Sequence, residues 1–192
     1  FLLLLIIYLS FVSLGLPDSM LGASWPLIYP SIGADVSMAG IVSMTACFGT
    51  VISSLAFAKI SKRFSTRVIT SFSIFVTSLA LFLMSKATSI YMMLPISILL
   101  GLGGGCVDSA LNNYVSLHYS TGAMSFLHGF WGVGTTIGPI LLGIILPLGY
   151  TWRTGYFSIS IVQAAILILS LLGFPLWTLK EKENRKQGIY ED

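Results

Sequence analysis

Long apolar runs separated by short polar segments dominate this sequence. A helix of about 20 apolar residues crosses a hydrocarbon layer about 30 Å thick, because each residue adds about 1.5 Å to its length. The runs are long enough for six such helices, which we expect at 1–31, 38–58, 68–86, 90–117, 122–148 and 154–178. This pattern predicts an all-α polytopic membrane protein, with a transmembrane bundle at 1–179 and a cytoplasmic tail or the start of a central loop at 180–192.

The composition agrees with a membrane protein, because 55% of the residues are hydrophobic and only 9% are charged. The alternative that Phe1–Leu16 is the core of a signal peptide is disfavoured, since no basic residue precedes it and further apolar runs follow. The sequence begins at Phe1 rather than Met and stops soon after its last apolar run. We therefore expect a natural N-terminus ahead of Phe1 and a longer protein beyond the tail.

Basic residues gather on one predicted side of the membrane. If the spans alternate in direction, the N-terminus, the 59–67 and 118–121 loops and the tail share that side. It holds eight of the ten basic residues, namely Lys59, Lys62, Arg63, Arg67, Lys180, Lys182, Arg185 and Lys186. By the positive-inside rule this side is the cytoplasm, so both termini are expected there, with the protein in the plasma (inner) membrane.

Two acidic residues, Asp18 and Asp108, stand inside apolar runs. Their surroundings repeat, as Gly15-x-x-Asp18-Ser19-x-Leu21 and Gly105-x-x-Asp108-Ser109-x-Leu111. A carboxylate near the centre of a bilayer costs about 3 kcal/mol, which indicates a functional role, and we predict that both acids couple transport to protons. The repeat 90 residues apart also predicts a three-plus-three inverted duplication.

Other polar and aromatic side chains recur at helical spacing beside these acids or on the fifth predicted span. We expect these residues to contact substrate: Trp25, Tyr29, Asn112, His128, Trp131 and Thr135. Alternatives remain open for several positions. Trp25 and Tyr29 could pack in the core, Asp18 could cap a helix restarted after Pro17, and His128 could be a satisfied buried histidine. The glycines between 101 and 105 fit close helix packing better than ligand binding.

Three stretches of the sequence resemble the N-terminal six-helix half of a major facilitator superfamily transporter, in particular the fucose, galactose and glucose proton symporter group. They are Leu14-Gly15-Leu16-Pro17-Asp18 with Trp25-Pro26, Gly105-Cys106-Val107-Asp108 with Asn112-Asn113, and Met124-x-x-Leu127-His128-Gly129-Phe130-x-Gly132-x-Gly134-x-x-x-Gly138-Pro139. The resemblance implies half of a twelve-helix fold, roles in proton coupling and sugar binding for Asp18 and Asp108, and substrate contact for His128. The loop Ala58 to Arg67 departs from the superfamily pattern, because Lys62 replaces its acid and both glycines are lost.

We therefore expect a secondary active transporter that moves a small, sugar-like solute with protons by alternating access. Its expected partners are the solute, protons, the lipid bilayer and a second six-helix bundle, with no cofactor, metal site or nucleic acid. Two other classes remain open, a proton-coupled antiporter or drug exporter and a non-transporting fragment or scaffold. An intramembrane aspartyl protease is disfavoured, because the Gly-x-Gly-Asp and Tyr-Asp patterns are absent, so we expect no enzymatic activity.

Overall fold

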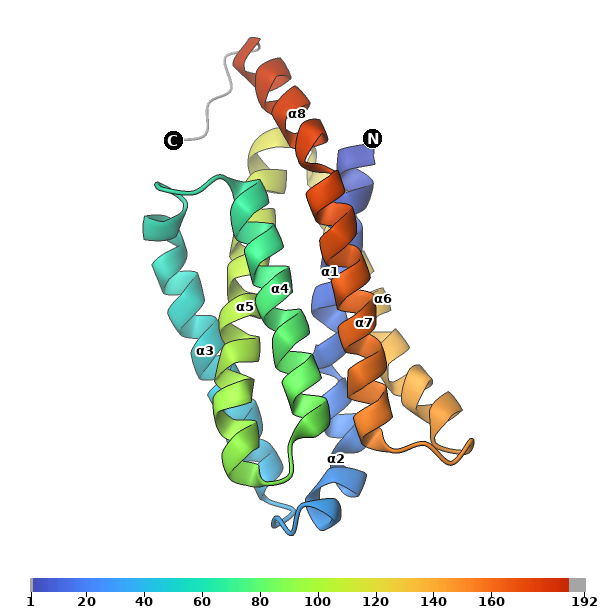
Figure 1. Ribbon diagram of the computed structural model, residues 1–192. Coiled ribbons are helices and arrows are strands. Elements are labelled where there is room, and N and C mark those ends of the chain that lie inside the picture. The colour runs from blue at the N-terminus through green and yellow to red at the C-terminus, as the bar shows by residue number, and fades with distance from the viewer. Residues whose placement is uncertain (1, 187–192) are drawn as a thin grey trace.

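The computed structural model describes residues 2–186, with side chains through Lys180, and this part of the chain is entirely helical apart from its turns. Its helices are α1 (Leu2–Asp18), α2 (Met20–Ser31), α3 (Met38–Ile60), α4 (Thr66–Lys86), α5 (Ile90–His118), α6 (Thr121–Ile145), α7 (Trp152–Leu172) and α8 (Phe174–Lys186) (Figure 1). With α1 and α2 counted as one span, six helical segments among these residues are long and apolar enough to cross a membrane. The predicted all-α polytopic fold is confirmed.

Two predicted spans need correction at their C-terminal ends. The fifth ends at Ile145 rather than 148, and the sixth ends at Leu172 rather than 178. After Leu172 the chain restarts as α8, because Pro175 has no N–H to bond to the carbonyl of Leu171. Residues 180–186 continue α8 and so are helical, within the segment predicted as a cytoplasmic tail or the start of a central loop. Residues 187–192 of that predicted tail lie outside the described residues.

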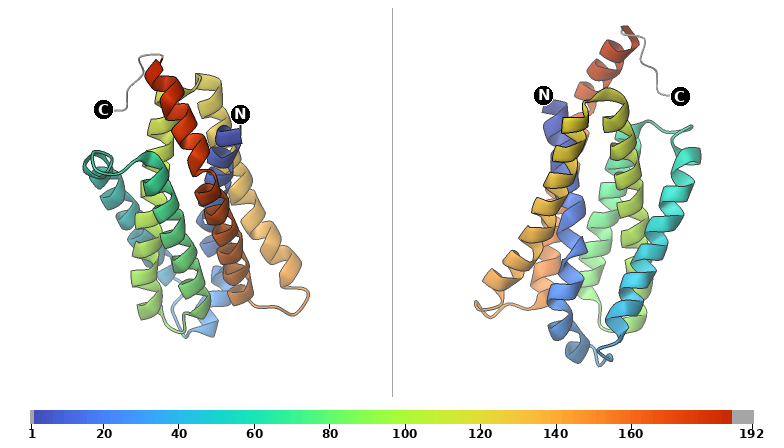
Figure 2. Two further views of the ribbon diagram at one scale, coloured as in Figure 1. Left: turned by 45° about the horizontal axis from the view of Figure 1, so that its top comes forward. Right: turned by 180° about the vertical axis from the view of Figure 1, so that it is seen from behind.

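Helix packing displays the predicted inverted repeat. The helix α1 packs along α6 and also contacts α7, while α5 packs along α3 and also contacts α4 (Figure 2). Exchanging α1 with α5, α3 with α6 and α4 with α7 maps these pairs onto one another and leaves the contact between α4 and α7 unchanged. The packing thus relates the first three spans to the last three, as in half of a major facilitator fold.

Glycine residues bring the paired helices into backbone contact. A Cβ atom on Gly134 of α6 would overlap the carbonyl oxygen of Val12 on α1, and one on Gly101 of α5 would overlap that of Ala46 on α3. Side chains larger than hydrogen would therefore force both pairs apart. The packing role that the sequence favoured for the glycines between 101 and 105 is confirmed for Gly101.

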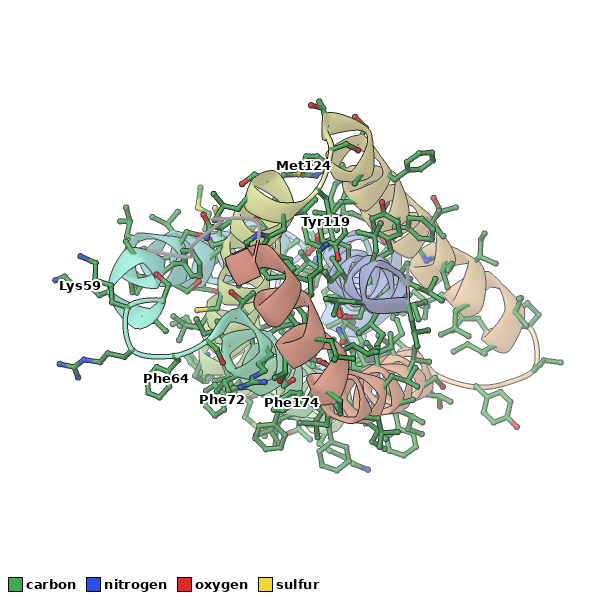
Figure 3. The ribbon with its side chains drawn as sticks, turned by 90° about the horizontal axis from the view of Figure 1, so that it is seen from above. Lys59, Phe64, Phe72, Tyr119, Met124 and Phe174 are labelled. Carbon is green, nitrogen blue, oxygen red and sulfur yellow. The ribbon has the colours of Figure 1, made fainter. Side chains whose placement is uncertain are left out.

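The helix α8 is attached to the end of the bundle where both ends of the described chain lie (Figure 1). The guanidinium Nη1 of Arg67 donates a hydrogen bond of 2.5 Å to Thr178 Oγ1, and Trp177 is buried with its ring centroid 4.6 Å from that of Tyr114. Figure 3 looks onto this end, with Lys59 and Phe64 beside the α3–α4 turn and Phe174 at the start of α8. Four of the basic residues used for the topology prediction, those in the 59–67 loop, lie at this end; the side chains of Lys182, Arg185 and Lys186 lie outside the described ones.

Gly134→Ala should destabilise the protein, because the new methyl group meets the α1 backbone and cannot be accommodated by a side-chain rotation. We expect the free energy of unfolding to fall by about 1–3 kcal/mol, as for other overpacked sites. Thermal unfolding of the purified protein in detergent measures this change. The matched control is Gly143→Ala on the same helix, where a Cβ would meet nothing within 4 Å. Equal midpoints for the two variants would contradict the close approach.

Candidate functional site

A cavity of about 840 Å³ opens among the helices, and each of α1 to α7 contributes to its wall. Its size lies within the range of about 300–1,000 Å³ that is usual for small-molecule sites. Four of the sequence-predicted residues line it together: Asp18, Asp108, His128 and Trp131. The rest of the wall is mostly apolar, with polar groups that include Ser43, Thr50, Thr77, Ser97 and Gln163.

Asp18 lines the cavity at the point where the first span is interrupted. The helix α1 ends at Asp18, Ser19 separates it from α2, and Pro17 lies in the last turn of α1. The Asp18 carboxylate accepts a hydrogen bond of 2.8 Å from Trp131 Nε1 on α6. The alternative that Asp18 caps the restarted helix is wrong, because Ser19 occupies the N-cap position.

The Ser19 side chain does not cap α2. It links the junction between α1 and α2 to α6. Its hydroxyl donates a hydrogen bond of 2.5 Å to the carbonyl of Thr135 on α6. That carbonyl needs a donor, since the residue four positions later in α6 is Pro139, which has no N–H. Asp18 and Ser19 therefore both bond across to α6 at the point where α1 stops.

Asp108 lies on α5, is half-buried and is oriented by its own helix. Its Oδ1 accepts a hydrogen bond of 2.9 Å from Asn112 Nδ2, one turn later. Asp18 of α1 and His128 of α6 line the same cavity as Asp108. Asn112 does not line the cavity, and its side-chain amide contacts Asp108 instead.

The repeated Gly-x-x-Asp pattern has a geometric explanation. Gly15 packs against the α6 backbone, and Gly105 packs against Thr50 and Ser53 of α3. Because an α-helix turns by about 100° per residue, a side chain three positions later points about 60° away from the glycine. Each acid therefore lies just beside a close helix contact, where it faces the cavity.

His128 is exposed, and its ring makes an edge contact with Phe11 at a centroid distance of 5.9 Å. It is therefore not the satisfied buried histidine that the sequence left as an alternative. Together with Trp131, one turn along α6, it places a ring nitrogen and an indole beside the two carboxylates.

Three other predicted substrate contacts lie outside the cavity lining, namely Trp25, Tyr29 and Thr135. Trp25 is buried, and its Nε1 donates a hydrogen bond of 2.8 Å to the carbonyl of Val36 in the turn before α3. Tyr29 packs beside the Trp25 ring at a centroid distance of 6.5 Å. The Thr135 hydroxyl bonds to the Gly132 carbonyl of its own helix. These contacts match the core-packing alternative for Trp25.

Sequence reasoning missed Gln163, which lines the cavity from α7. It carries the same kind of signal as the two acids, because it is an amide within an otherwise apolar span. Unlike the two acids, it does not stand in a motif that is repeated elsewhere in the sequence.

No curated protein matched the chain. The family model of the Major Facilitator Superfamily matches residues 7–191, which includes nearly all of the first span and the whole of the other five. The combination of six apolar spans, an inverted repeat and a central cavity is the architecture of half of that family's fold. The chain belongs to the major facilitator superfamily of membrane transporters.

Proposed function

We propose that the protein is a secondary active transporter that moves a small, sugar-like solute together with protons by alternating access. The observation that carries this proposal is that two carboxylates, Asp18 and Asp108, line one small-molecule-sized cavity within the membrane-spanning part of the chain. Packing alone does not require an ionisable group at such positions, and two at repeat-related positions favour a coupled transport cycle.

Both carboxylates are suited to taking up and releasing a proton. Each accepts a hydrogen bond from a neutral donor, Trp131 Nε1 or Asn112 Nδ2. A protonated carboxyl keeps an acceptor oxygen for such a donor, so both protonation states satisfy it. Protonation also removes the charge that the bilayer penalises. Asp18 and Asp108 are therefore our candidates for the proton-coupling residues.

A hydroxylated ring compound fits the chemistry of the cavity wall. The exposed Trp131 indole offers a flat apolar face, and His128 and the carboxylates offer hydrogen-bond partners to hydroxyl groups. These residues come from α1, α5 and α6, so a solute bound between them would touch both halves of the inverted repeat. Rocking of this bundle against a second six-helix bundle would then change access to the solute.

We further propose that a second six-helix bundle closes the cavity from the side opposite α4 and α7. The helices α3 and α6 leave large apolar side chains exposed, among them Phe48 and Leu55 on α3 and Phe126 and Ile144 on α6. These faces need lipid or another bundle against them. The basic end of the bundle, with Lys59 and Arg67, is the expected cytoplasmic side, so both termini are proposed to lie there in the plasma (inner) membrane.

A proton-coupled antiporter or drug exporter is the second candidate. It is favoured by the mostly apolar wall of the cavity, which includes Phe11, Leu14 and Met84. The solute class separates the two candidates. Binding of D-galactose, L-fucose and D-glucose to the protein in lipid nanodiscs, set against binding of weakly basic aromatic drugs, measures it. Saturable sugar binding without drug binding is the expected result, and drug binding alone would favour the exporter.

Asp108→Asn should retain sugar binding and lose proton-driven accumulation, because the amide keeps the shape of the carboxyl but carries no transferable proton. A gradient of about one pH unit supports about tenfold accumulation per coupled proton, and the variant should reach only the outside concentration. Uptake of labelled sugar into proteoliposomes with and without the gradient measures this. Asp35→Asn is the matched control, since Asp35 is exposed in the α2–α3 turn and bonds to Ser37. Undiminished accumulation by Asp108→Asn would exclude the coupling role.

Trp131→Phe should mainly change sugar affinity, whereas Trp25→Phe should mainly change stability. The first removes the indole that contacts Asp18 in the cavity, so we expect sugar affinity to fall by about fivefold to tenfold with little loss of stability. The second removes a buried hydrogen bond to Val36, so we expect about 1–3 kcal/mol lower stability and unchanged affinity. Sugar titrations and thermal unfolding of both variants test this. Lower sugar affinity in Trp25→Phe alone would contradict this prediction, because it would place the substrate contact at Trp25 rather than at Trp131.

A further inference from the structure

Gln163 makes a hydrogen bond that depends on the interruption of α1. Its side chain is 1% exposed, and its Nε2 donates a bond of 2.7 Å to the carbonyl of Ser13. The residue four positions after Ser13 is Pro17, which has no N–H. Pro17 therefore leaves the Ser13 carbonyl without its helical donor, and Gln163 supplies one from α7.

The same bond fixes which way the amide is turned. The group facing the Ser13 carbonyl must be the nitrogen, because two acceptor oxygens cannot share a hydrogen. The other atom, Oε1, is then an acceptor directed away from Ser13. Among the described side chains it is one of the few buried polar atoms without a hydrogen-bond partner. A buried acceptor without a donor costs about 1–3 kcal/mol, so native proteins rarely leave one unpaired.

The cavity is where the missing donor can come from, because Gln163 is part of its wall. Two other polar groups of this wall are already used within their own helices. The hydroxyl of Thr77 bonds to the Ile74 carbonyl, and that of Ser97 bonds to the Met93 carbonyl. Oε1 is buried in this structure, so a hydroxyl group of a molecule in the cavity reaches it only after a small displacement of the wall, and then satisfies it without breaking either bond.

We propose that Gln163 is a solute-binding residue whose Oε1 accepts a hydrogen bond from a hydroxyl of the transported solute, while its Nε2 holds the Ser13 carbonyl that Pro17 frees. The inference rests on the proposed function, because it takes the solute to be a hydroxylated compound in the cavity. It adds a fourth helix to the site, since Asp18, Asp108 and His128 come from α1, α5 and α6 and Gln163 comes from α7. One side chain then joins the solute to the helix interruption beside Asp18.

A pair of substitutions separates the two roles of the amide. Gln163→Leu removes both hydrogen bonds, and Pro17→Ala restores a backbone N–H that can bond to Ser13 without help from Gln163. The protein in lipid nanodiscs is compared as wild type, Gln163→Leu, Pro17→Ala and the double variant. Two quantities are measured for each, the thermal unfolding midpoint without sugar and the affinities for D-galactose, L-fucose and D-glucose.

We expect Gln163→Leu to lower both the unfolding midpoint and the sugar affinity, the latter by about fivefold to tenfold, as for the loss of one hydrogen bond. In the Pro17→Ala background the same substitution should leave the midpoint nearly unchanged and still weaken sugar binding by a similar factor. If Gln163→Leu alone does not fold, a comparison of the double variant with Pro17→Ala still measures the effect of Gln163 on sugar affinity.

Two results would overturn the inference while leaving the proposed function intact. The first is wild-type sugar affinity in Gln163→Leu, and the second is equal affinity in Pro17→Ala and the double variant, which would reduce Gln163 to a support for α1. If the wild-type protein binds none of the three sugars, the proposed solute class fails and the inference fails with it. The wild-type titration therefore distinguishes the two failures.

Discussion

The lack of water inside a bilayer is the constraint on which the rest of this structure depends, because every backbone polar group there needs a partner from the protein. Two prolines free carbonyl groups in adjacent helices, Pro17 in α1 and Pro139 in α6. Both carbonyls are satisfied by side chains from another span, Ser13 by Gln163 and Thr135 by Ser19. The interruption of the first span is thus tolerated because α7 lies close enough to supply a donor, and the α1–α2 junction in turn supplies the donor that α6 lacks.

Close helix contact also determines where the acids lie. Glycines bring α1 against α6 and α5 against α3, and each acid follows its glycine by three residues. The two contacts are related by the inverted repeat. The same spacing of glycine and acid therefore occurs twice and places Asp18 and Asp108 on one cavity. This arrangement ties the packing of the bundle to the chemistry of its centre, since a change at either glycine would also move an acid.

Much of the fold was predictable because it follows from length and polarity along the chain. The six spans and the repeat could be read from apolar runs and from a repeated motif. The end of the sixth span could not, because α8 continues the helical pattern past Gly173 and its apolar residue Trp177 packs on Tyr114 from α5. Trp25 and Trp131 show the same limit for the site. Both are aromatic residues at helical spacing from polar groups, yet one is buried against Val36 and the other is exposed beside Asp18.

The sequence by itself determined that the chain is a bundle of membrane-spanning helices with two repeat-related acids, because hydrophobic length and the cost of an intramembrane charge are local properties. Only the tertiary structure decided which side chains share the cavity with those acids. Asn112 and Thr135 lie on the predicted faces but bond within their own helices, whereas Gln163 reaches the cavity from a span without a motif. The physical reason is that a helix's rotation and its neighbours are fixed by contacts between segments far apart in the chain, and no local pattern encodes those distances.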